Sequence, residues 1–381
     1  MINDNTQDNE RVKILIKILK KFVDDCNLGK IEKEIIGSGS FGLVSEIENK
    51  DDNNKNYAAK VLERNYNDYE KEPNESDLIL EFRGPNIAKV NKIYHKNYDK
   101  KNYDLILMEK APLNDLKTFV ENINKEHLDL IFKTPFEIIG NNLIRYFLKQ
   151  LIKGFETLYF GNYTHFDFKP ENTLIFNNLV IKLTDFGLLR NPNKIKDNLN
   201  KLIIPGFTEG YIPPEIYYNE GHKISVSEAN KFDYFSLGAT LYFLKYGEIM
   251  MDYPKYKNDI SKADCMIKLI ERAIDKIQAT KSNDKDFNDF LINLINYKPE
   301  NRISFEEAYR NKWLNKNWKK ILEIKENNIN DNKKLIIELD KSEFLFEKNN
   351  HVNEQRKQIG IINANENESK KINYHKFKFK L

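Results

Sequence analysis

The sequence predicts an α+β protein in which a small antiparallel β-sheet precedes a larger, mainly helical part. Short alternating apolar runs joined by polar turns occupy much of residues 31–108, a pattern typical of strands in hairpins. Longer segments with helical apolar spacing recur over residues 141–297. The chain has 381 residues, is 40% hydrophobic and contains 24 Phe and 20 Tyr. It can therefore bury a sizeable core.

The composition limits which partners and which cellular compartment are expected. Lys and Arg total 61 against 58 for Asp and Glu, a formal net charge of +3, so we expect no nucleic-acid partner. Cys26 and Cys265 lie far apart and the six histidines form no metal-ligand pattern, which favours a reducing compartment, the cytoplasm first and the nucleus second. The longest uncharged apolar stretch, residues 234–244, is too short for a ~30 Å bilayer core. We therefore predict neither a signal peptide nor a transmembrane segment.

Both ends of the chain differ from its centre. Residues 11–25 carry apolar side chains at helical spacing with lysines on the other side, which predicts an amphipathic helical extension over residues 1–30. Packing on the rest of the chain is its simpler use, and contact with a partner or an anionic membrane is the alternative. Residues 319–381 mix Lys, Glu and Asn with few apolar clusters, so we expect a charged, largely disordered tail.

The period of the apolar pattern predicts the individual elements. We predict strands over residues 31–36, 43–48, 57–62, 88–94, 105–108, 173–176 and 180–183. We predict helices over residues 141–160, 229–246, 261–279 and 286–297. One further helix, carrying Leu78, Ile79 and Phe82, is expected between Pro73 and Gly84.

A glycine-rich turn separates the first two predicted strands. It contains Gly37, Gly39 and Gly42, with Val44 two residues further on. Without a Cβ the backbone can approach phosphate oxygens closely. A dinucleotide-binding turn with the same spacing opens a helix, whereas apolar alternation here continues into a strand. The sequence therefore predicts a phosphate-binding hairpin.

Residues 165–172 place three chemically distinct groups close together. Asp167 can accept a proton from an attacking hydroxyl, and Lys169 can neutralise charge on a moving phosphoryl group. Asn172 can offer an amide oxygen to Mg²⁺. The stretch therefore indicates phosphoryl-transfer chemistry.

These motifs resemble those of eukaryotic-type protein kinases. Residues 165–172 are similar to H-R-D-x-x-x-x-N, with Phe166 in place of Arg, and Asp185 opens a D-F-G motif. Ala58-Ala59-Lys60 resembles V-A-I-K, and residues 208–215 resemble the segment that closes the activation loop. The resemblance implies a bilobal protein-kinase-like fold. It implies a kinase domain over residues 31–318, with an N-lobe of about 31–110 and a C-lobe of about 111–318.

The resemblance also implies ATP and Mg²⁺ as the bound groups. Lys60 would hold the α- and β-phosphates with Glu75 as its counter-charge, Glu72 and Glu81 being alternatives. Asn172 and Asp185 would bind the metal. The implied nucleotide-binding residues are Gly37, Gly39, Gly42, Val44, Ala58, Lys60, Met108, Glu109, Ala111, Asp115 and Leu174.

The pattern around the implied base indicates the acceptor. Lys169 and Thr208 resemble the Ser/Thr-specific kinases, so the implied reaction transfers the γ-phosphoryl group of Mg-ATP to Ser or Thr hydroxyls of protein substrates. Thr208 would hydrogen-bond Asp167 and Lys169. Glu215 would pair with Arg302, and Asp233 would anchor the catalytic loop backbone. The five implied catalytic residues are Asp167, Lys169, Lys60, Glu75 and Thr208.

One departure from the family pattern bears on control. An Arg at the position of Phe166 would need an anion, usually a phosphorylated loop residue. Between Gly187 and Gly206 there is no Ser, Thr or Tyr. We therefore predict a kinase that works without activation-loop phosphorylation.

Two other function classes stay open. The first is a pseudokinase or scaffold module that binds ATP and partners without transfer, and the second is transfer to a small molecule. The presence of Lys60, Asp167, Asn172 and Asp185 favours an enzyme over the first. The segment around Glu215, together with Arg302, favours protein acceptors over the second.

Overall fold

The described residues form two compact units. The computed structural model describes residues 4–39, 42–49, 55–64, 74–126, 141–197, 199–218, 222–252, 262–279 and 284–315. The sheet unit lies within Met1–Phe119 and Pro170–Leu189, and the helical unit within Val120–Lys169 and Arg190–Leu381. The predicted sequence of a sheet part followed by a helical part is confirmed. Residues 170–189 belong to the sheet unit because Leu183 donates to the carbonyl of Asn86 and accepts from the N–H of Ala88.

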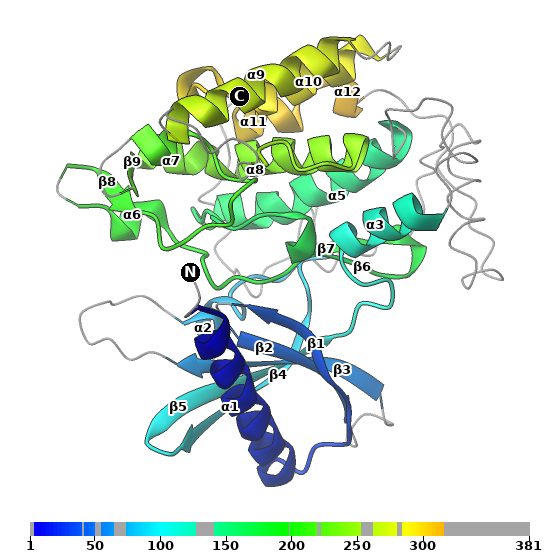
Figure 1. Ribbon diagram of the computed structural model, residues 1–381, viewed down its shortest axis with the longest axis vertical. Helices are drawn as coiled ribbons and strands as arrows, with labels where there is room; N and C mark the ends of the chain where they lie inside the picture. Colours follow the sequence, from blue (N-terminus) through cyan, green and yellow to red (C-terminus); the bar gives the residue numbers. More distant parts are fainter. Residues whose placement is uncertain are drawn as a thin grey trace, which may run out of the picture. The chain divides into compact units, whose positions relative to one another are not determined.

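Five antiparallel strands form the centre of the sheet unit. They are β1 (Ile31–Gly39), β2 (Gly42–Asn49), β3 (Lys55–Arg64), β4 (Val90–Tyr98) and β5 (Lys101–Glu109). Their spatial order is β1-β2-β3-β5-β4 (Figure 1). All five predicted strands exist, and all end later than predicted because ladder pairing continues into polar residues, as in Arg64↔Asn102. The predicted start at residue 88 is wrong, since the N–H of Ala88 donates to the carbonyl of Leu183 and β4 begins at Val90.

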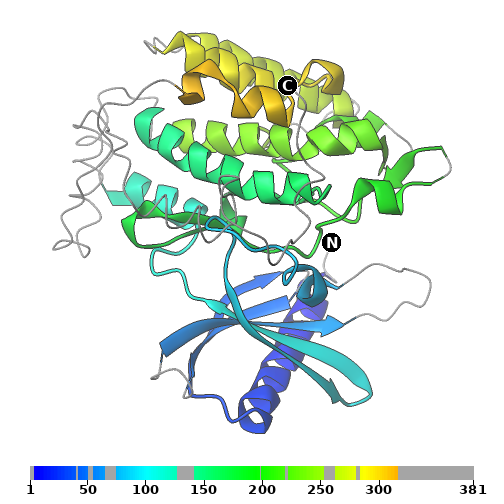
Figure 2. The ribbon, with the colours of Figure 1, turned by 180° about the vertical axis from the view of Figure 1, so that it is seen from behind.

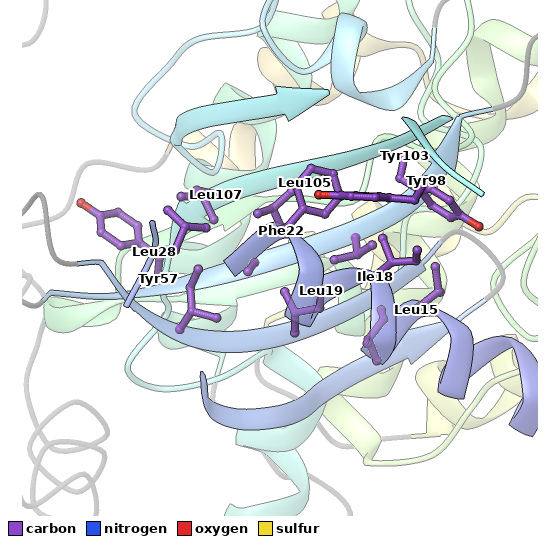
Figure 3. Close-up of a cluster of buried hydrophobic side chains, with 14 residues drawn as sticks. Leu15, Ile18, Leu19, Phe22, Leu28, Tyr57, Tyr98, Tyr103, Leu105 and Leu107 are labelled. Carbon is purple, nitrogen blue, oxygen red and sulfur yellow. The ribbon is translucent and has the colours of Figure 1, made fainter. Parts of the chain in front are cut away.

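Helix α1 (Asp4–Asp25) packs across one face of this sheet (Figure 1). Leu15, Ile18, Leu19 and Phe22 are buried there together with alternate residues of the strands. Figure 3 shows these side chains between α1 and the sheet. The simpler prediction for the N-terminal helix, packing on its own chain, is confirmed. Its apolar face is thereby occupied by the sheet, while lysines such as Lys17 stay exposed.

Strand alternation divides the side chains of the sheet between two faces. On β3, Tyr57, Ala59 and Val61 contribute to the cluster under α1. Ala58 and Lys60 therefore project from the opposite face. The predicted nucleotide-binding positions of this strand thus lie on the face away from α1.

Helix α2 (Glu75–Leu78) is much shorter than the helix predicted between Pro73 and Gly84. Asn74 has an extended conformation and caps the helix, which fixes its start. Ile79 caps the end and the N–H of Glu81 turns back to the carbonyl of Leu78, so Phe82 follows the helix instead of belonging to it. Pro73 lies outside the described residues.

A hairpin and a two-stranded ribbon complete the β-structure. The hairpin joins β6 (Thr173–Ile175) and β7 (Ile181–Leu183) through η3 (Asn177–Leu179), and η2 (Pro170–Asn172) precedes it. The ribbon joins β8 (Lys201–Ile203) and β9 (Lys223–Ser225) in the helical unit. The predicted strands over residues 173–176 and 180–183 form the hairpin, each one residue shorter than predicted, whereas the ribbon was not predicted.

The remaining elements are helical. They are α3 (Leu116–Glu126), α5 (Asn141–Phe160), α6 (Pro192–Ile195), α7 (Glu215–Tyr218), α8 (Val226–Tyr246), α9 (Lys262–Ala279), α10 (Lys285–Leu294), η6 (Pro299–Asn301), α11 (Phe305–Tyr309) and α12 (Lys312–Asn315). The predicted helix over residues 141–160 is confirmed at both ends. The predicted domain end near Trp318 and the predicted tail over residues 319–381 lie outside the described residues.

Helices α5 and α8 lie side by side in the centre of the helical unit (Figure 2). Phe155 of α5 contacts Tyr234 of α8, with ring centroids 6.4 Å apart. Ser225 and Glu228 form a capping box at the start of α8, and Gly247 ends it with a φ of 70°. The helix that carries Asp233 is therefore capped at both ends and packed against α5.

Candidate active site

Lys60 of β3 is the centre of a buried charge cluster in the sheet unit. Its ammonium donates to both carboxylate oxygens of Glu75, each at 2.7 Å, and to Oδ1 of Asp185 at 2.9 Å. The side chains of Lys60 and Glu75 are only 6% and 4% exposed. Glu75 is thus the carboxylate that pairs with Lys60, whereas Glu81 is exposed and Glu72 lies outside the described residues.

The cluster has an excess of negative charge. Burial alone would lower the pKa of the Lys60 ammonium, but the charges of Asp185 and Glu75 outweigh it and raise that pKa above its ordinary value. Burial raises the pKa of the Glu75 carboxyl, Lys60 opposes the rise, and the charge of Asp185 adds to it. One permanent cation between two carboxylates leaves the cluster suited to a further cation.

The β6–β7 hairpin brings the two predicted metal ligands to the same end of one ladder. Its last pair is Thr173↔Leu183, so Asn172 precedes one strand and Asp185 follows the other by two residues. The N–H of Thr184 donates to the carbonyl of Asn172 at 3.1 Å. Asp185 has a φ of 62°, which a non-glycine residue rarely adopts. Local backbone strain of this kind recurs at ligand sites.

The donor set of these two residues fits Mg²⁺. A carboxylate and an amide supply hard oxygen ligands, and Mg²⁺ usually takes one or two protein ligands and completes its shell with phosphate oxygens and water. Within the described ranges, no group of three or more His, Cys, Asp or Glu side chains is placed to hold a metal by itself. The phosphates of a bound nucleotide would therefore have to contribute ligands.

Several of the implied nucleotide-binding residues come from neighbouring parts of the sheet unit. Ala58 pairs with Met108 across β3 and β5, and Val44 pairs with Lys60 across β2 and β3. Leu174 of β6 forms a bridge with Asp115. These positions of the predicted nucleotide site therefore belong to one unit.

The glycine-rich turn joins β1 to β2. Gly39 pairs with Gly42, and Gly37 pairs with Val44. At Gly42, φ is 152° and a Cβ would lie 2.5 Å from the carbonyl oxygen of Val61. Only glycine fits there, and the two residues between Gly39 and Gly42 lie outside the described ranges.

Two polar residues of the predicted pocket already have intramolecular roles. The carboxylate of Glu109 accepts from the N–H of Lys89 at 2.6 Å and from Lys182 at 2.7 and 2.8 Å. The N–H of Glu109 donates to the carbonyl of Lys89 at 3.0 Å, so this backbone group is also engaged within the sheet unit. Asp115 caps α3 by accepting from the N–H and the hydroxyl of Thr118, each at 2.8 Å.

Asp167, Lys169 and Thr208 form a second cluster, which lies in the helical unit. Lys169 donates to Oδ2 of Asp167 at 2.8 Å and to Oγ1 of Thr208 at 2.6 Å. The Thr208 hydroxyl donates to Oδ1 of Asp167 at 2.6 Å. Thr208 thus contacts both Asp167 and Lys169, as the resemblance implies, and Lys169 additionally binds the second oxygen of the predicted base.

Buried contacts hold the backbone that carries the base. Asp233 of α8 accepts from the N–H of His165 at 2.7 Å and from the N–H of Phe166 at 3.1 Å, which confirms its predicted anchoring role. Burial raises the pKa of the Asp233 carboxyl, and these hydrogen bonds oppose the rise. Phe166 has a φ of 62°, and its ring is fully buried 5.2 Å from that of Phe232. The side chain at the unusual position is therefore part of the core.

A buried ion pair holds the end of the predicted activation segment. Arg302 donates from Nη1 and Nη2 to the two carboxylate oxygens of Glu215, at 2.7 and 2.9 Å, as the sequence predicts. The two side chains are 0% and 4% exposed. This bidentate geometry fixes the first turn of α7.

Sequence reasoning does not single out one buried carboxylate, that of Asp104 on β5. It accepts from the hydroxyl of Ser76, the residue after Glu75. In the sequence, an acidic residue directly precedes the apolar run of residues 105–108, and strand alternation places it on the same face of the sheet as Ile106. This pattern indicates a buried carboxylate.

The described residues include no helix long and apolar enough to span a membrane. In the sequence, Lys169 of the helical unit is followed directly by Pro170 of the sheet unit. Asp167 and Asn172 are five positions apart.

Comparisons with known proteins identify the same motif-bearing region. The family model described as the protein kinase domain matches residues 31–314. Serine/threonine-protein kinase AtPK2/AtPK19 of Arabidopsis thaliana is 26% identical over 76% of this chain and 55% of its own length. Serine/threonine-protein kinase cds1 of Schizosaccharomyces pombe is 26% identical over 73% of this chain and 57% of its own length.

Calcium/calmodulin-dependent protein kinase type 1 of Caenorhabditis elegans is 27% identical over 75% of this chain and 74% of its own length. The chain spans little more than half the length of the first two relatives. The matched region contains both clusters described above.

Proposed function

Because the chain belongs to the protein kinase family, we propose that it transfers the γ-phosphoryl group of ATP to Ser or Thr hydroxyls of protein substrates. The observation that carries the proposal is the complete pair of clusters, Lys60 with Glu75 and Asp185, and Asp167 with Lys169 and Thr208. The relatives above, with their serine/threonine-protein kinase names, support the acceptor class.

In the proposed complex, the sheet unit binds the nucleotide. Lys60 would contact the α- and β-phosphates, and its pair with Glu75 would hold the ammonium in place. The hairpin at Gly42 would lie close to the phosphates. Asn172 and Asp185 would hold Mg²⁺, which neutralises phosphate charge when bound. The protein contributes mainly positioning and fixed charge.

The helical unit would act on the acceptor. Asp167 would orient the attacking hydroxyl and accept its proton. Lys169 would remain close to the transferred group, because its ammonium is held by Asp167 and Thr208. The hydrogen bonds of both groups would hold them in position, so the reaction would require little reorganisation.

The direct test is transfer of labelled phosphate from Mg-[γ-³²P]ATP to a mixed protein acceptor, followed by phosphoamino acid analysis. We expect phosphoserine or phosphothreonine. Phosphotyrosine alone, or label only on small-molecule acceptors, would contradict the proposed acceptor class. Binding of Mg-ATP without any transfer would favour the second candidate, a pseudokinase or scaffold module.

We further propose that the enzyme needs no phosphate on its activation loop. The buried ring of Phe166 stands where a phosphate-binding cation would be, and residues 188–205 contain no Ser, Thr or Tyr. Asp197 organises this segment instead by accepting from the N–H groups of Leu199 and Lys201, both at 2.9 Å. The β8–β9 ribbon adds backbone pairing.

We therefore expect phosphatase treatment to leave the transfer rate unchanged within about twofold, since no charge-assisted contact of the loop depends on a phosphate. Mass spectrometry of the active protein, digested so that peptides cover residues 188–206, should show no phosphate there. A kinase with a phosphorylated activation loop, treated in parallel, controls for phosphatase activity. A loop phosphate whose removal abolishes transfer would overturn the proposal.

A further inference from the structure

We propose that Asp104 is a positioning residue for nucleotide binding, because it holds the short helix α2 where Glu75 meets Lys60. The proposal rests on the proposed role of Lys60 in binding phosphates. It concerns residues of the sheet unit alone, and Asp104 lies in none of the family motifs identified in the sequence.

Helix α2 is too short to fix Glu75 by itself. It has four residues, and its backbone bonds run from Leu78 to Asn74 at 3.1 Å and from Ile79 to Glu75 at 2.9 Å. Helices of this length are unstable in water without tertiary contacts. The position of the Glu75 carboxylate therefore depends on what the other side chains of α2 touch.

The residue directly after Glu75 is tied to the sheet. Ser76 is buried and donates its hydroxyl to Oδ2 of Asp104. Asp104 is fully buried on β5 and also accepts from Arg64 Nη1 at 3.2 Å. Nδ1 of His95 lies 2.6 Å from its Oδ1. A buried carboxylate with several partners is a firm attachment point, since each bond would be costly to leave unmade.

The next residue of α2 is tied to the same network. Arg64, at the end of β3, donates from Nη2 to both oxygens of Asp77, at 3.0 and 2.7 Å. Oδ2 of Asp77 also accepts from the N–H of Asn74 and so caps the helix. Asp104 and Arg64 thus connect two strands to the two residues that follow Glu75.

The polar contacts of α2 define its orientation, which apolar packing does not. Leu78, the last residue of α2, and Ile79, its C-cap, are buried, but burial of apolar surface is non-directional and does not specify the rotation of the helix. Hydrogen bonds have preferred directions, so the contacts of Ser76 and Asp77 define which way the helix faces. Glu75, one residue earlier, is thereby directed at Lys60.

The test measures affinity for Mg-ADP by isothermal titration calorimetry, which requires no phosphoryl transfer. Asp104→Asn should weaken binding about fivefold, because residues in one contact network couple to this extent. Glu75→Gln should weaken it as well. In the Glu75→Gln background, Asp104→Asn should have no further effect, since its influence on Lys60 runs through Glu75. A purely structural role would give additive losses instead.

Glu63→Gln is the matched control. Glu63 neighbours Arg64 on β3 but pairs with exposed Lys101 at 2.8 Å, so its replacement should leave affinity unchanged. If Asp104→Asn does not fold, Asp77→Asn repeats the test at a side chain that is 39% exposed. If the variants fold and bind Mg-ADP as tightly as the wild type, or if their losses of affinity add to that of Glu75→Gln, this inference is wrong while the proposed function stands. A wild-type protein that does not bind Mg-ADP would overturn the proposed function and this inference with it.

Discussion

Asp167→Asn is expected to lower kcat for phosphoryl transfer about 10³-fold, within the range that general-base catalysis contributes. Asn has nearly the same shape, and its amide oxygen can still accept from the Thr208 hydroxyl, so the local fold should persist. It cannot take the proton of the acceptor hydroxyl, and it loses the charged contact with Lys169. Steady-state kinetics with a protein acceptor would measure the loss.

The KM for ATP distinguishes the loss of the base from general damage to the fold. The residues proposed to bind ATP belong to the sheet unit, so the KM for ATP should change less than about threefold in Asp167→Asn, as expected when only a transition-state interaction is removed. Asp275→Asn, at an exposed position on α9, is the control and should behave as the wild type. A kcat within tenfold of the wild-type value would show that Asp167 is not the base.

Much of the fold follows from sequence because long periodic segments specify their own structure. The apolar stripe over residues 141–160 gives α5 at its observed ends, and alternation gives all five strands of the sheet. The β8–β9 ribbon was not predictable in this way. Its strands have three residues each, and pairing with a distant segment decides their conformation more than local preference does.

The same contrast applies to the candidate site. Motif residues such as Lys60 and Asp167 are recognisable because the chemistry needs those residue types at fixed spacing. The length of α2 and its attachment through Asp104 depend on contacts between β3, β5 and residues 74–79, which no short pattern encodes. Sequence therefore identifies the reacting groups better than the groups that position them.

Arg302→Met is expected to lower the free energy of unfolding by about 3–5 kcal/mol, because it leaves the Glu215 carboxylate buried without its cation. Arg302 also donates from Nε to the carbonyl of Asn296 at 3.0 Å, and its guanidinium lies 5.0 Å from the Phe235 ring centroid. Methionine retains part of the apolar stem and none of these hydrogen bonds. Urea unfolding followed by circular dichroism would measure the change.

Lys276→Met provides a control matched in distance and different in burial. Lys276 lies 2.7 Å from Glu248, the same separation as Arg302 from Glu215, but these side chains are 32% and 54% exposed. Solvent screens such a pair, so its loss should cost less than about 1 kcal/mol. In the double variant Arg302→Met/Glu215→Met no buried charge is left without a partner. Its loss of stability should therefore be smaller than the sum of the losses in Arg302→Met and Glu215→Met. Equal costs for Arg302→Met and Lys276→Met would show that burial of the Glu215 pair is not what stabilises the end of the activation segment.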